Sequence, residues 1–473
     1  MTSEAQKKKR VHMIAICGTG MGSLAGMLKA SGYRVTGSDE KIYPPMSTIL
    51  QDQGIECRSG FSEKNIDPDV DLVIIGNAVS KTNPEVQAVL AKNLPYLSFP
   101  QALSEFFLEG KKPIVVAGTH GKTTTSSLMA WILESAGLNP SFMIGGFVKN
   151  FSSNYHLGKG PYFVVEGDEY DSAFFDKGPK FLHYRPIYSI LTSIEFDHGD
   201  IYKNLRQIQE AFQKFVRLIP KEGLLMVSGE DTNIREILGG IPCRVETYGI
   251  GKGYDWNADR IESLKEGMKF EVFHRGQYFE TFVSSLMGTH NLKNSLAVIA
   301  LGHHLQVSKE ALKKGIQTFE GVKRRQEIVG VVKNVMIMDD FAHHPTAIRE
   351  TLHAVKLRFP DKRLWAVFEP RSATSRRNFF QKEFSRCFDE ANKVVISYPP
   401  GMEKIPAEMR LDPFLLVKEI SRGGPPAFLC QNSDEIVKQI TNDIHSGDLI
   451  CVMSSGGFDG IHGKLLKALE HKM

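Results

Sequence analysis

The segment 115–125 constrains the fold of this chain more than any other part of the sequence. It reads Val-Val-Ala-Gly-Thr-His-Gly-Lys-Thr-Thr-Thr, an apolar strand that runs into a glycine turn and then into a predicted helix at 126–136. The two glycines allow the backbone to curl so that successive N–H groups point at one anion, and the helix directs its positive end to the same place. The pattern predicts a phosphate-binding loop.

The loop also carries the side chains that a nucleotide phosphate site needs. Lys122 supplies a mobile positive charge, and the Thr123 hydroxyl can ligate the accompanying magnesium ion. The generic motif has a glycine five residues before Gly121, where this chain has Val116, and a Gly-Lys-Thr tripeptide alone also fits an ordinary turn. The strand and the helix on either side favour the phosphate site. The candidate contacts are Gly118, Thr119, His120, Gly121, Lys122, Thr123 and Thr124.

Length and composition indicate a globular protein with several domains. A chain of 473 residues is expected to form about three domains. Its net charge of +4 is too small to indicate a nucleic-acid partner, and no apolar run approaches the roughly 20 residues that span a bilayer. The six cysteines are scattered without a Cys-x-x-Cys pair, as expected of reduced thiols in the cytoplasm. The basic run Lys7-Lys8-Lys9-Arg10 is expected to be a solvated tail, because the apolar stretch after it is too short for a secretory signal.

The first hundred residues have the layout of a dinucleotide-binding unit. A predicted strand at 12–17 leads into a glycine turn at 18–22 and a helix at 23–31, and a second strand at 34–37 ends at Ser38-Asp39. The third glycine of the standard spacing would stand at Ser23, whereas Gly22 comes one residue early. The turn therefore favours a diphosphate-bearing ligand in general over a nicotinamide cofactor. A later strand at 71–75, followed by Gly76-Asn77, is expected to reach the same crevice.

Acidic residues and one histidine follow two predicted strands of the central region. The strand 162–165 ends at Glu166-Gly167-Asp168-Glu169-Tyr170-Asp171, and the strand 188–193 is followed by Glu195-Phe196-Asp197-His198. We expect Glu166 and His198 to be metal ligands, and most of the other acidic residues after the first strand to cap helices.

The last third of the chain predicts another α/β domain. Strands are expected at 335–338, 364–368, 393–397 and 448–453, with helices between them. The segment Gly288-Thr289-His290-Asn291-Leu292-Lys293-Asn294 is expected to precede an alanine-rich helix, and Lys111-Lys112-Pro113 is expected to be a linker. A zinc site at the adjacent pair His343-His344 is disfavoured, because adjacent residues rarely point at one ion and no cysteine is nearby in the sequence.

Taken together, these motifs resemble the Mur ligase family of ATP-dependent, amide-forming enzymes of peptidoglycan synthesis. The resemblance covers essentially the whole chain. Its motifs are Gly118-Thr119-His120-Gly121-Lys122-Thr123-Thr124, Glu166-x-Asp168-Glu169-x-Asp171, Glu195-x-Asp197-His198, Gly288-x-His290-Asn291-x-x-Asn294, Arg324-Arg325 and Asp339-Asp340-x-x-His343-His344-Pro345.

Further segments resemble one branch of the family, which works on UDP-N-acetylmuramate. His120 and the histidine pair are similar to that branch. Within it, the chain is similar to the recycling members that join UDP-N-acetylmuramate to the tripeptide L-alanyl-γ-D-glutamyl-meso-diaminopimelate. The segments that carry this similarity are Tyr43-Pro44-Pro45-Met46-Ser47-Thr48, 166–177, Glu369-Pro370-Arg371-Ser372 and Met453-Ser454-Ser455-Gly456-Gly457-Phe458.

The resemblance implies three α/β domains and two cofactors, ATP and Mg²⁺. Residues 1–110 would form a Rossmann-like UDP-sugar-binding domain, 111–322 the central P-loop ATPase domain, and 323–473 a Rossmann-like domain that closes the ATP site and binds the peptide acceptor. By the same resemblance, Lys122, Glu166 and His198 would be catalytic, and Thr123, Glu166 and His198 would hold metal. Asn291, Asn294, Arg325 and Asp340 would also contact ATP, and Gly18, Thr19, Gly20, Met21, Gly22, Asp39 and Asn77 would contact the UDP-sugar.

Two points remain open from the sequence. Arg371 is the first candidate for contacting the acceptor carboxylates, with Ser372, Ser454 and Ser455 after it, although a surface arginine after a strand is also common. The activity could instead be the addition of L-alanine in de novo peptidoglycan synthesis, and a nicotinamide-binding protein is a third reading that leaves the phosphate loop unexplained. The expected partners are UDP-N-acetylmuramate and the tripeptide, with no nucleic acid and no membrane insertion.

Overall fold

The computed structural model describes residues 9–42 and 46–472. The chain forms two compact units, one made of 1–194, 208–247 and 300–312 and the other of 195–207, 248–299 and 313–473. Within the described ranges, no helix has the length and apolar character that a membrane crossing requires. Lys7 and Lys8 of the expected basic tail, and Tyr43, Pro44 and Pro45 of the family-like segment, lie outside the described residues.

The first unit begins with a parallel five-stranded sheet in the order β3-β2-β1-β4-β5. Because the chain moves outward from β1 in both directions, the strand order reverses between β1 and β4. A crevice at the carboxyl ends of such strands is the usual ligand site of a doubly wound sheet. The strands are β1 (Arg10–Ile14), β2 (Arg34–Asp39), β3 (Glu56–Ser59), β4 (Leu72–Ile75) and β5 (Tyr96–Ser98). The helices are α1 (Thr19–Ala30), α2 (Met46–Asp52), α3 (Pro84–Ala91) and α4 (Phe99–Leu103).

Helix α1 begins at Thr19, four residues earlier than the sequence predicts. Gly22 therefore lies inside the helix and not in a turn. A Cβ atom on Gly22 would stand 2.3 Å from the sulfur of Met46, and one on Gly26 would stand 2.4 Å from the hydroxyl oxygen of Tyr155. Gly22 and Gly26 are therefore needed for close packing of this helix.

The same unit contains six strands of the central sheet, in the order β13-β12-β6-β9-β7-β8. All neighbours are parallel except β7 and β8. Lys112 and Pro113 begin β6, so the prediction that they form a linker is wrong. The strands are β6 (Lys112–Ala117), β7 (Ser141–Val148), β8 (Ser153–His156), β9 (Tyr162–Gly167), β12 (Tyr188–Leu191) and β13 (Leu224–Ser228), and the helices are α5 (Lys122–Ser135), α6 (Leu205–Val216) and α7 (Thr232–Ile237).

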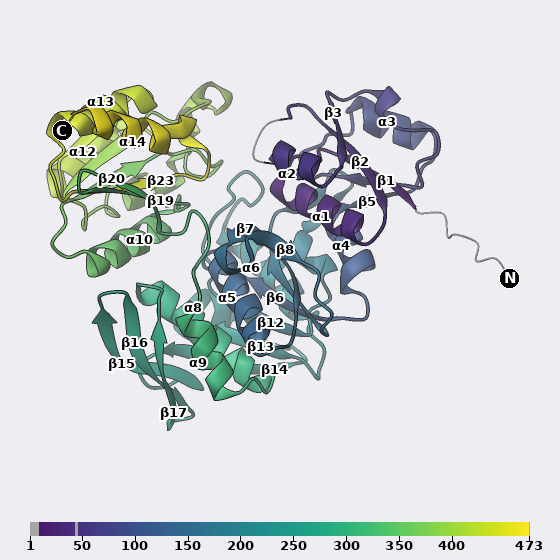
Figure 1. The fold of residues 1–473 in the computed structure, drawn as a ribbon, viewed down its shortest axis with the longest axis horizontal. Helices are drawn as coiled ribbons and strands as arrows, with labels where there is room; N and C mark the ends of the chain where they lie inside the picture. Colours follow the sequence, from purple (N-terminus) through teal and green to yellow (C-terminus); the bar gives the residue numbers. More distant parts are fainter. Residues whose placement is uncertain (1–8, 43–45, 473) are drawn as a thin grey trace. The chain divides into compact units, whose positions relative to one another are not determined.

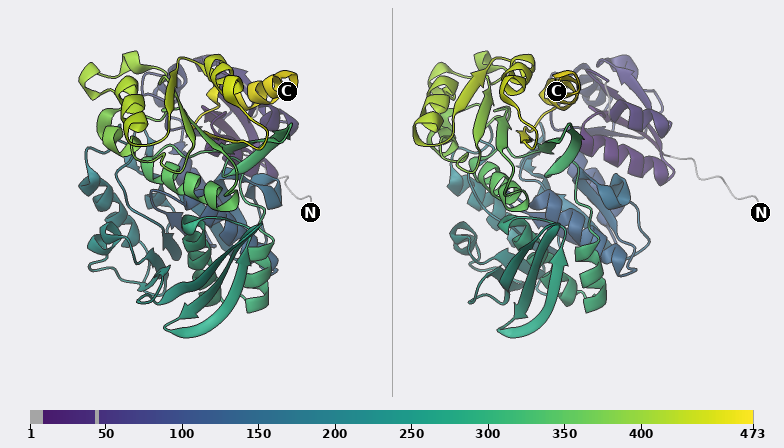
Figure 2. Two further views of the ribbon diagram at one scale, coloured as in Figure 1. Left: turned by 90° about the vertical axis from the view of Figure 1, so that its left-hand side faces the viewer. Right: turned by 60° about the vertical axis from the view of Figure 1, so that its left-hand side comes forward.

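The second unit contains an antiparallel meander that the sequence analysis did not predict. The last residues of β14 (Arg244–Ile250) pair with β15 (Trp256–Leu264), which pairs with β16 (Gly267–His274), which pairs with β17 (Gln277–Ser284). Figure 2 shows β15, β16 and β17 side by side. The turn between the last two strands has positive φ at Arg275 (51°) and Gly276 (78°), the geometry that matches strand twist in a tight hairpin.

The carboxyl-terminal part of the second unit is a six-stranded sheet in the order β18-β19-β23-β20-β21-β22. Only β18 is antiparallel. The strands are β18 (Glu327–Val332), β19 (Val335–Asp340), β20 (Leu364–Phe368), β21 (Lys393–Ser397), β22 (Ala427–Cys430) and β23 (Leu449–Met453), and the helices are α10 (Pro345–Arg358), α11 (Gln381–Phe384), α12 (Pro413–Gly423), α13 (Ser433–Asp443) and α14 (Ile461–Lys472). Two helices earlier in the chain, α8 (Thr289–His304) and α9 (Lys309–Gln317), are divided between the two units.

Both faces of this sheet are covered by helices. Leu364, Ala366 and Phe368 of β20 pack with apolar residues of α10, α11 and α12, whereas Trp365 and Val367 pack with those of α13 and α14. Figure 1 shows α10 on one side of β20, β19 and β23 and α13 and α14 on the other. Continuous apolar strands are typical of parallel sheets, because both faces are buried.

One partly buried ion pair joins the starts of β20 and β23. The Arg363 guanidinium donates from Nε to Asp448 Oδ1 at 3.0 Å and from Nη2 to Oδ2 at 2.7 Å, and Trp365 Nε1 donates to the same carboxylate. Burial acts to raise the pKa of Asp448, but the hydrogen bonds from Arg363, the His445 N–H and Trp365 outweigh it and lower that pKa. The charged form of Asp448 therefore stabilises the fold.

Replacing this carboxylate is expected to destabilise the protein in a pH-dependent way. We expect Asp448→Asn to lower the free energy of unfolding by about 1–3 kcal/mol at pH 7, because Arg363 loses the closer of its two carboxylate partners and keeps only Asp443 at 3.8 Å. Since the folded pKa lies below the unfolded value of about 3.9, the contribution is complete above that value and is lost as the pH falls below it. Urea unfolding at pH 7 and pH 3, with the exposed Asp361→Asn as control, measures this difference. An equal loss at both pH values would contradict the argument.

Candidate functional site

The phosphate loop is a tight connection between β6 and α5. The strand ends at Ala117, and Gly118 has a φ of 131°, a conformation that L side chains rarely adopt. A Cβ atom on Gly118 would lie 2.3 Å from Thr192 Oγ1 and 2.9 Å from the Ser193 nitrogen. Only glycine fits this position.

The end of β12 holds the loop in place. The N–H of Thr119 donates to the Ser193 carbonyl at 2.8 Å, the N–H of His120 donates to Ser193 Oγ at 3.0 Å, and Thr192 Oγ1 donates to the His120 carbonyl. The expectation that successive loop N–H groups face one anion is therefore wrong for Thr119 and His120. The start of α5 remains the predicted anion site.

Helix α5 begins at Lys122, not at Ser126 as expected, and Gly121 precedes it with a φ of 79°. No described side chain caps this helix. The first N–H groups of an α-helix have no partner inside the helix, and together with the helix dipole they form an anion-binding site. Thr123 and Thr124 lie in this first turn.

The Lys122 ammonium is held by protein oxygens. It donates to Glu169 Oε1 at 3.0 Å and Oε2 at 2.9 Å, and to the Gly118 carbonyl at 2.6 Å. Burial acts to lower the pKa of Lys122, but the carboxylates of Glu169, Glu166 and Asp168 outweigh it and raise that pKa. Lys122 is thus a charged group at neutral pH, positioned at the loop.

The acidic residues after β9 do not cap a helix, so that expectation is wrong. A short strand, β10 (Asp171–Ala173), follows them. Asp168 pairs with Lys180 at 2.5 Å, and Asp171 pairs with Lys177 at 3.4 Å. Burial acts to raise the pKa of Asp168, but the Lys180 ammonium outweighs it and lowers that pKa to about 2.

Thr123 and Glu166 are brought together beside the loop. Thr123 Oγ1 donates to Glu166 Oε1 at 2.9 Å, and the Gly145 N–H donates to Glu166 Oε2 at 2.9 Å. Glu166 reaches this position because β9 pairs with β6 in a register that places it opposite Val116. A hydroxyl and a carboxylate next to a phosphate site are the hard oxygen ligands that Mg²⁺ prefers. These residues fit a magnesium ion.

The candidate UDP-sugar residues follow three adjacent strands. Gly18 precedes α1 after β1, Asp39 ends β2, and Asn77 follows β4. Asp39 Oδ2 accepts the N–H of Cys17 at 2.9 Å, which fixes its carboxylate beside the glycine segment. The structure thus gathers these residues at the carboxyl edge of the sheet, while Thr19, Gly20, Met21 and Gly22 lie in the first turn of α1.

The remaining candidate ATP residues all lie in the second unit. Asn291 and Asn294 lie on α8, not before it as expected, and Asn294 Nδ2 donates to Asn291 Oδ1 at 3.3 Å. Asp340 is 3% exposed and accepts the N–H groups of Gln326 and Ala342, and burial raises its pKa.

Contacts with neighbouring residues link these candidates. Gln326 Nε2 lies 3.5 Å from His290 Nε2 on α8. The Arg325 guanidinium stacks over the Phe341 ring at 5.2 Å. Residues from α8, from the segment before β18 and from the end of β19 therefore meet.

His198 and the histidine pair lie in the second unit with Glu195 and Asp197. His198 has a φ of 54°, and its N–H donates to Asp197 Oδ1. His343 Nε2 lies 4.0 Å from Asp197 Oδ2. Burial acts to raise the pKa of Asp197, but the histidines around it outweigh burial and lower that pKa.

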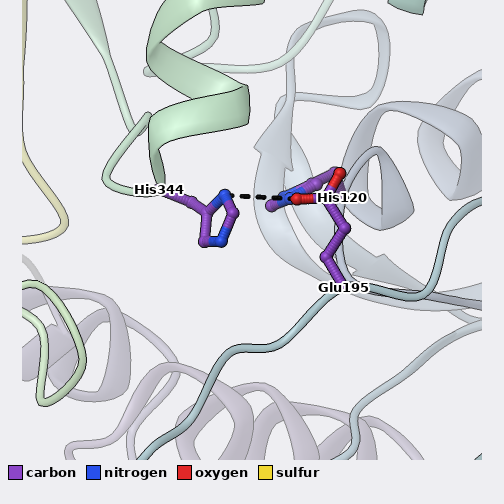
Figure 3. A group of neighbouring side chains, drawn as sticks. All are labelled: His120, Glu195 and His344. Atoms are coloured by element: carbon purple, nitrogen blue, oxygen red, sulfur yellow. Dashed lines mark ion pairs between the residues drawn. The ribbon is translucent and has the colours of Figure 1, made fainter. Parts of the chain in front are cut away.

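Both ring nitrogens of His344 face protein partners. Nδ1 accepts the Thr346 N–H at 3.3 Å, so Nε2 carries the proton that is donated to the Phe196 carbonyl at 3.2 Å. Figure 3 shows His344 and Glu195, whose Oε2 lies 3.5 Å from Nδ1. Thr346 Oγ1 donates to the same carboxylate. Glu195 was not singled out from the sequence, although its position after β12 was a signal.

The candidate acceptor residues divide into two groups. Ser454 Oγ donates to Glu369 Oε2, and Arg371 Nη1 lies 3.4 Å from Glu369 Oε1, so Arg371 and Ser454 meet around one carboxylate. Ser372 Oγ instead donates to Ser375 within its own turn. Ser455 follows Ser454 and is partly exposed. Sequence reasoning missed Glu369, which shares its motif with Arg371.

Comparisons with known proteins identify the family. Three family models match successive parts of the chain, "Mur ligase family, catalytic domain" at 10–110, "Mur ligase middle domain" at 116–302 and "Mur ligase, glutamate ligase domain" at 324–456. The chain is also 39% identical over 98% of its length to the UDP-N-acetylmuramate–L-alanyl-γ-D-glutamyl-meso-2,6-diaminoheptandioate ligase of Escherichia coli K12, of which 99% is covered. The chain belongs to the Mur ligase family.

Two further Mur ligases illustrate the range of similarity. The UDP-N-acetylmuramate–L-alanine ligase of Clostridium kluyveri is 35% identical over 96% of this chain and 97% of its own. The crystal structure of a murein peptide ligase from Psychrobacter arcticus matches with a TM-score of 0.74 at 36% identity, covering 98% of this chain and 99% of that one. The α/β fold class and the family resemblance expected from the sequence are confirmed. As a Mur ligase, the protein is an ATP-dependent ligase that forms C–N bonds, which implies ATP and a metal ion.

The packing of Gly118 generates a prediction with a matched control. We expect Gly118→Ala to reduce ADP release at least about 100-fold, because the added methyl group displaces the loop by a fraction of an ångström or more. Gly137 also has a positive φ, of 72°, but open space surrounds it. Gly137→Ala should therefore cost only about 1 kcal/mol of stability and leave turnover unchanged. Steady-state ADP release and thermal unfolding of both variants measure this, and normal turnover in Gly118→Ala would contradict it.

Proposed function

We propose that this Mur ligase joins UDP-N-acetylmuramate to the recycled tripeptide L-alanyl-γ-D-glutamyl-meso-diaminopimelate at the expense of ATP. The observation that carries the proposal is the 39% identity, over 98% of the chain, with the E. coli ligase named for these substrates. The segments 166–177 and 453–458 and the residues from Glu369 to Ser372 support it, because they resemble the recycling branch.

The reaction needs an activated carboxylate. The γ-phosphoryl group of ATP is transferred to the muramoyl carboxylate, and the resulting acyl phosphate is attacked by the amino group of the acceptor with release of phosphate. Bringing two anions together costs about 4 kcal/mol per pair of unit charges at 4 Å in a partly screened site. Cationic groups must offset this repulsion.

The loop residues are suited to that task. Lys122 is charged and partly exposed, and we assign it to the β- and γ-phosphates, with the first turn of α5 supplying further N–H donors. Thr123 and Glu166 would hold one Mg²⁺ and His198 a second, and magnesium supplies neutralising charge between phosphate and carboxylate when bound. Asn291, Asn294, Arg325 and Asp340 are assigned to the rest of ATP, and the residues at 18–22, Asp39 and Asn77 to the UDP-sugar.

The acceptor is assigned to the carboxyl-terminal domain, 323–473. Arg371 and Ser454, which meet at Glu369, are the first candidates for contacting it. Closure of that domain over 111–322 would complete the ATP site and exclude water from the acyl phosphate. The six cysteines are free thiols, which supports a reducing location such as the cytoplasm.

The L-alanine-adding reaction is the second candidate. The Clostridium kluyveri ligase named for that reaction is 35% identical over 96% of this chain, so the two activities share the whole architecture. The two reactions differ in the size and charge of the acceptor.

The acceptor experiment tests the proposal directly. ADP release is measured with ATP, magnesium and UDP-N-acetylmuramate, using either the tripeptide or free L-alanine. We expect release that depends on the tripeptide. Release with L-alanine alone would move the enzyme to the de novo pathway, and release with neither would reject the acceptor assignment.

A substitution tests the role of Lys122. We expect Lys122→Ala to reduce turnover at least about 1,000-fold, because the transferred phosphoryl group loses its main cation. Binding of UDP-N-acetylmuramate, measured by calorimetry, should survive, since its candidate residues lie on the five-stranded sheet. The exposed Lys112→Ala on β6 serves as control. Normal turnover in Lys122→Ala would reject the assignment of the phosphate loop.

A further inference from the structure

Arg324 is the first residue of the Arg324-Arg325 motif, and the proposed function gives a role only to the second. Its contacts join the ends of β19 and β23, which are neighbouring parallel strands of the carboxyl-terminal sheet (Figure 1). Its φ of 61° lies in the left-handed region, which residues other than glycine rarely adopt. Such a conformation persists only where surrounding contacts hold it, and it is typical of functional sites.

The Arg324 side chain holds the loop that follows β23. Nη2 donates to the Ser454 carbonyl at 2.8 Å and to the Gly456 carbonyl at 2.7 Å. Nε donates to Asp339 Oδ2 at 3.0 Å. One guanidinium thus fixes two carbonyls of this loop to the end of β19. The donors Nε and Nη2 are used within the protein, as expected of a residue that orients its neighbours.

A buried carboxylate orients this guanidinium. Asp339 is 7% exposed, and its Oδ1 lies 3.4 Å from His462 Nε2 on α14 while its Oδ2 accepts from Arg324. Burial acts to raise the pKa of Asp339, but its hydrogen bonds and ionic contacts with His462 and Arg324 outweigh burial and lower that pKa. Asp339 is therefore ionised at neutral pH and makes a charge-assisted hydrogen bond to Arg324. We call Arg324, Asp339 and His462 the loop clamp.

The loop held by the clamp also contacts the candidate acceptor residues. A Cβ atom on Gly456 would stand 2.3 Å from Cδ and Nε of Arg371, so the Arg371 side chain packs directly on this glycine. Ser454 Oγ donates to Glu369 Oε2, and Arg371 Nη1 lies 3.4 Å from Oε1 of the same carboxylate. The two residues whose carbonyls Arg324 binds are thus Ser454 itself and the glycine on which Arg371 packs.

The backbone of Arg324 has separate contacts. Its N–H donates to Glu327 Oε2 at 2.7 Å, and its carbonyl accepts the Phe341 N–H at 2.9 Å. Arg325, the candidate ATP contact, follows in the chain and stacks over the Phe341 ring at 5.2 Å. The Arg324 guanidinium stacks over the same ring at 5.2 Å, a cation–π contact that a lysine can also make. A change from arginine to lysine at position 324 is therefore expected to leave Arg325 in place.

We propose that Arg324 is a positioning residue for the amino acceptor, because its guanidinium fixes the loop 454–456 in the place from which Ser454 and Arg371 face the acceptor together. The inference rests on the proposed function and deepens it, since it says how the acceptor contacts are oriented. Binding residues on loops need such support from the residues around them. The loop clamp thus has a role that is separate from nucleotide binding.

The conservative variant Arg324→Lys tests the clamp. A lysine keeps the positive charge but lacks the planar guanidinium that binds both carbonyls and Asp339 together. KM is measured by ADP release for the tripeptide, for ATP and for UDP-N-acetylmuramate. The KM of the tripeptide should rise about 10-fold or more, as expected for one lost charge-assisted hydrogen bond, while the other two stay within about twofold. An equal rise for all three substrates, or no rise for the tripeptide, would overturn the proposal.

Two neighbouring glycines give a matched pair of variants that leave Arg324 intact. Gly456→Ala places a methyl group against the Arg371 side chain and should raise the KM of the tripeptide about 10-fold. Gly457 has a φ of −78° and open space around it, so Gly457→Ala should leave that KM unchanged. Thermal unfolding of each variant is measured alongside. If Arg324→Lys does not fold, this pair decides, and equal KM values in the two glycine variants would reject the proposal.

A double variant shows whether Arg324 acts through Arg371. In the Arg371→Ala background, Arg324→Lys should raise the KM of the tripeptide by a smaller factor than in the wild-type background, because one of the contacts that Arg324 orients is gone. Equal factors in the two backgrounds would mean that the two residues act independently, which contradicts the proposal.

The outcomes distinguish this inference from the proposed function. Tripeptide-dependent activity with an unchanged tripeptide KM in Arg324→Lys rejects the clamp and leaves the proposed function standing. If the wild-type enzyme uses L-alanine and not the tripeptide, the proposed function fails, and the KM of L-alanine becomes the readout for the same variants. A rise of that KM in Arg324→Lys then supports the clamp, and an unchanged value rejects it. No ADP release with either acceptor rejects both.

Discussion

The close approach of Gly118 to the end of β12 is the constraint on which the phosphate site depends. Thr192 and Ser193 occupy the space where a side chain at position 118 would stand, and the same two residues bind the backbone of the loop. This contact fixes where α5 begins. Lys122 and Thr123 are the first two residues of that helix. The directions of their side chains therefore depend on the contact of Gly118 with the end of β12, in which neither residue takes part.

The order of strands in the parallel sheets determines where the other candidate groups lie. Residues at the carboxyl ends of neighbouring strands gather at one edge. Glu166 lies at the end of β9, and Gly18 and Asn77 follow β1 and β4. In the carboxyl-terminal sheet, Glu369 and Tyr398 follow β20 and β21. The parallel sheets therefore supply polar groups at one edge, and the carboxyl-terminal sheet keeps its apolar residues between layers of helices.

This regularity explains how far the sequence could predict the site. The sequence shows apolar strands followed by glycine or acidic residues, so the sheets, the position of Lys122 in the loop after a strand and the strand-end positions of Glu166 and Asp39 were predicted. The partners of these groups were not, because they depend on strand order. Nothing in the sequence shows that Lys122 meets Glu169 while Asp168 meets Lys180. The antiparallel strands β15 to β17 were missed because the segments between them carry no strong turn signal.

The pairing of Lys122 with Glu169 means that any anion bound at the loop competes with a carboxylate for the same ammonium. Both carboxylate oxygens of Glu169 lie at hydrogen-bond distance from Lys122 Nζ. The electrostatic binding free energy of such an anion is the difference between its own attraction to Lys122 and the attraction of Glu169 that it replaces. A singly charged anion resembles the Glu169 carboxylate, so the exchange yields almost no binding free energy. A polyphosphate carries several negative charges, so the exchange yields much more binding free energy. If Lys122 binds phosphate as proposed, its pairing with Glu169 favours anions of high charge over singly charged ones.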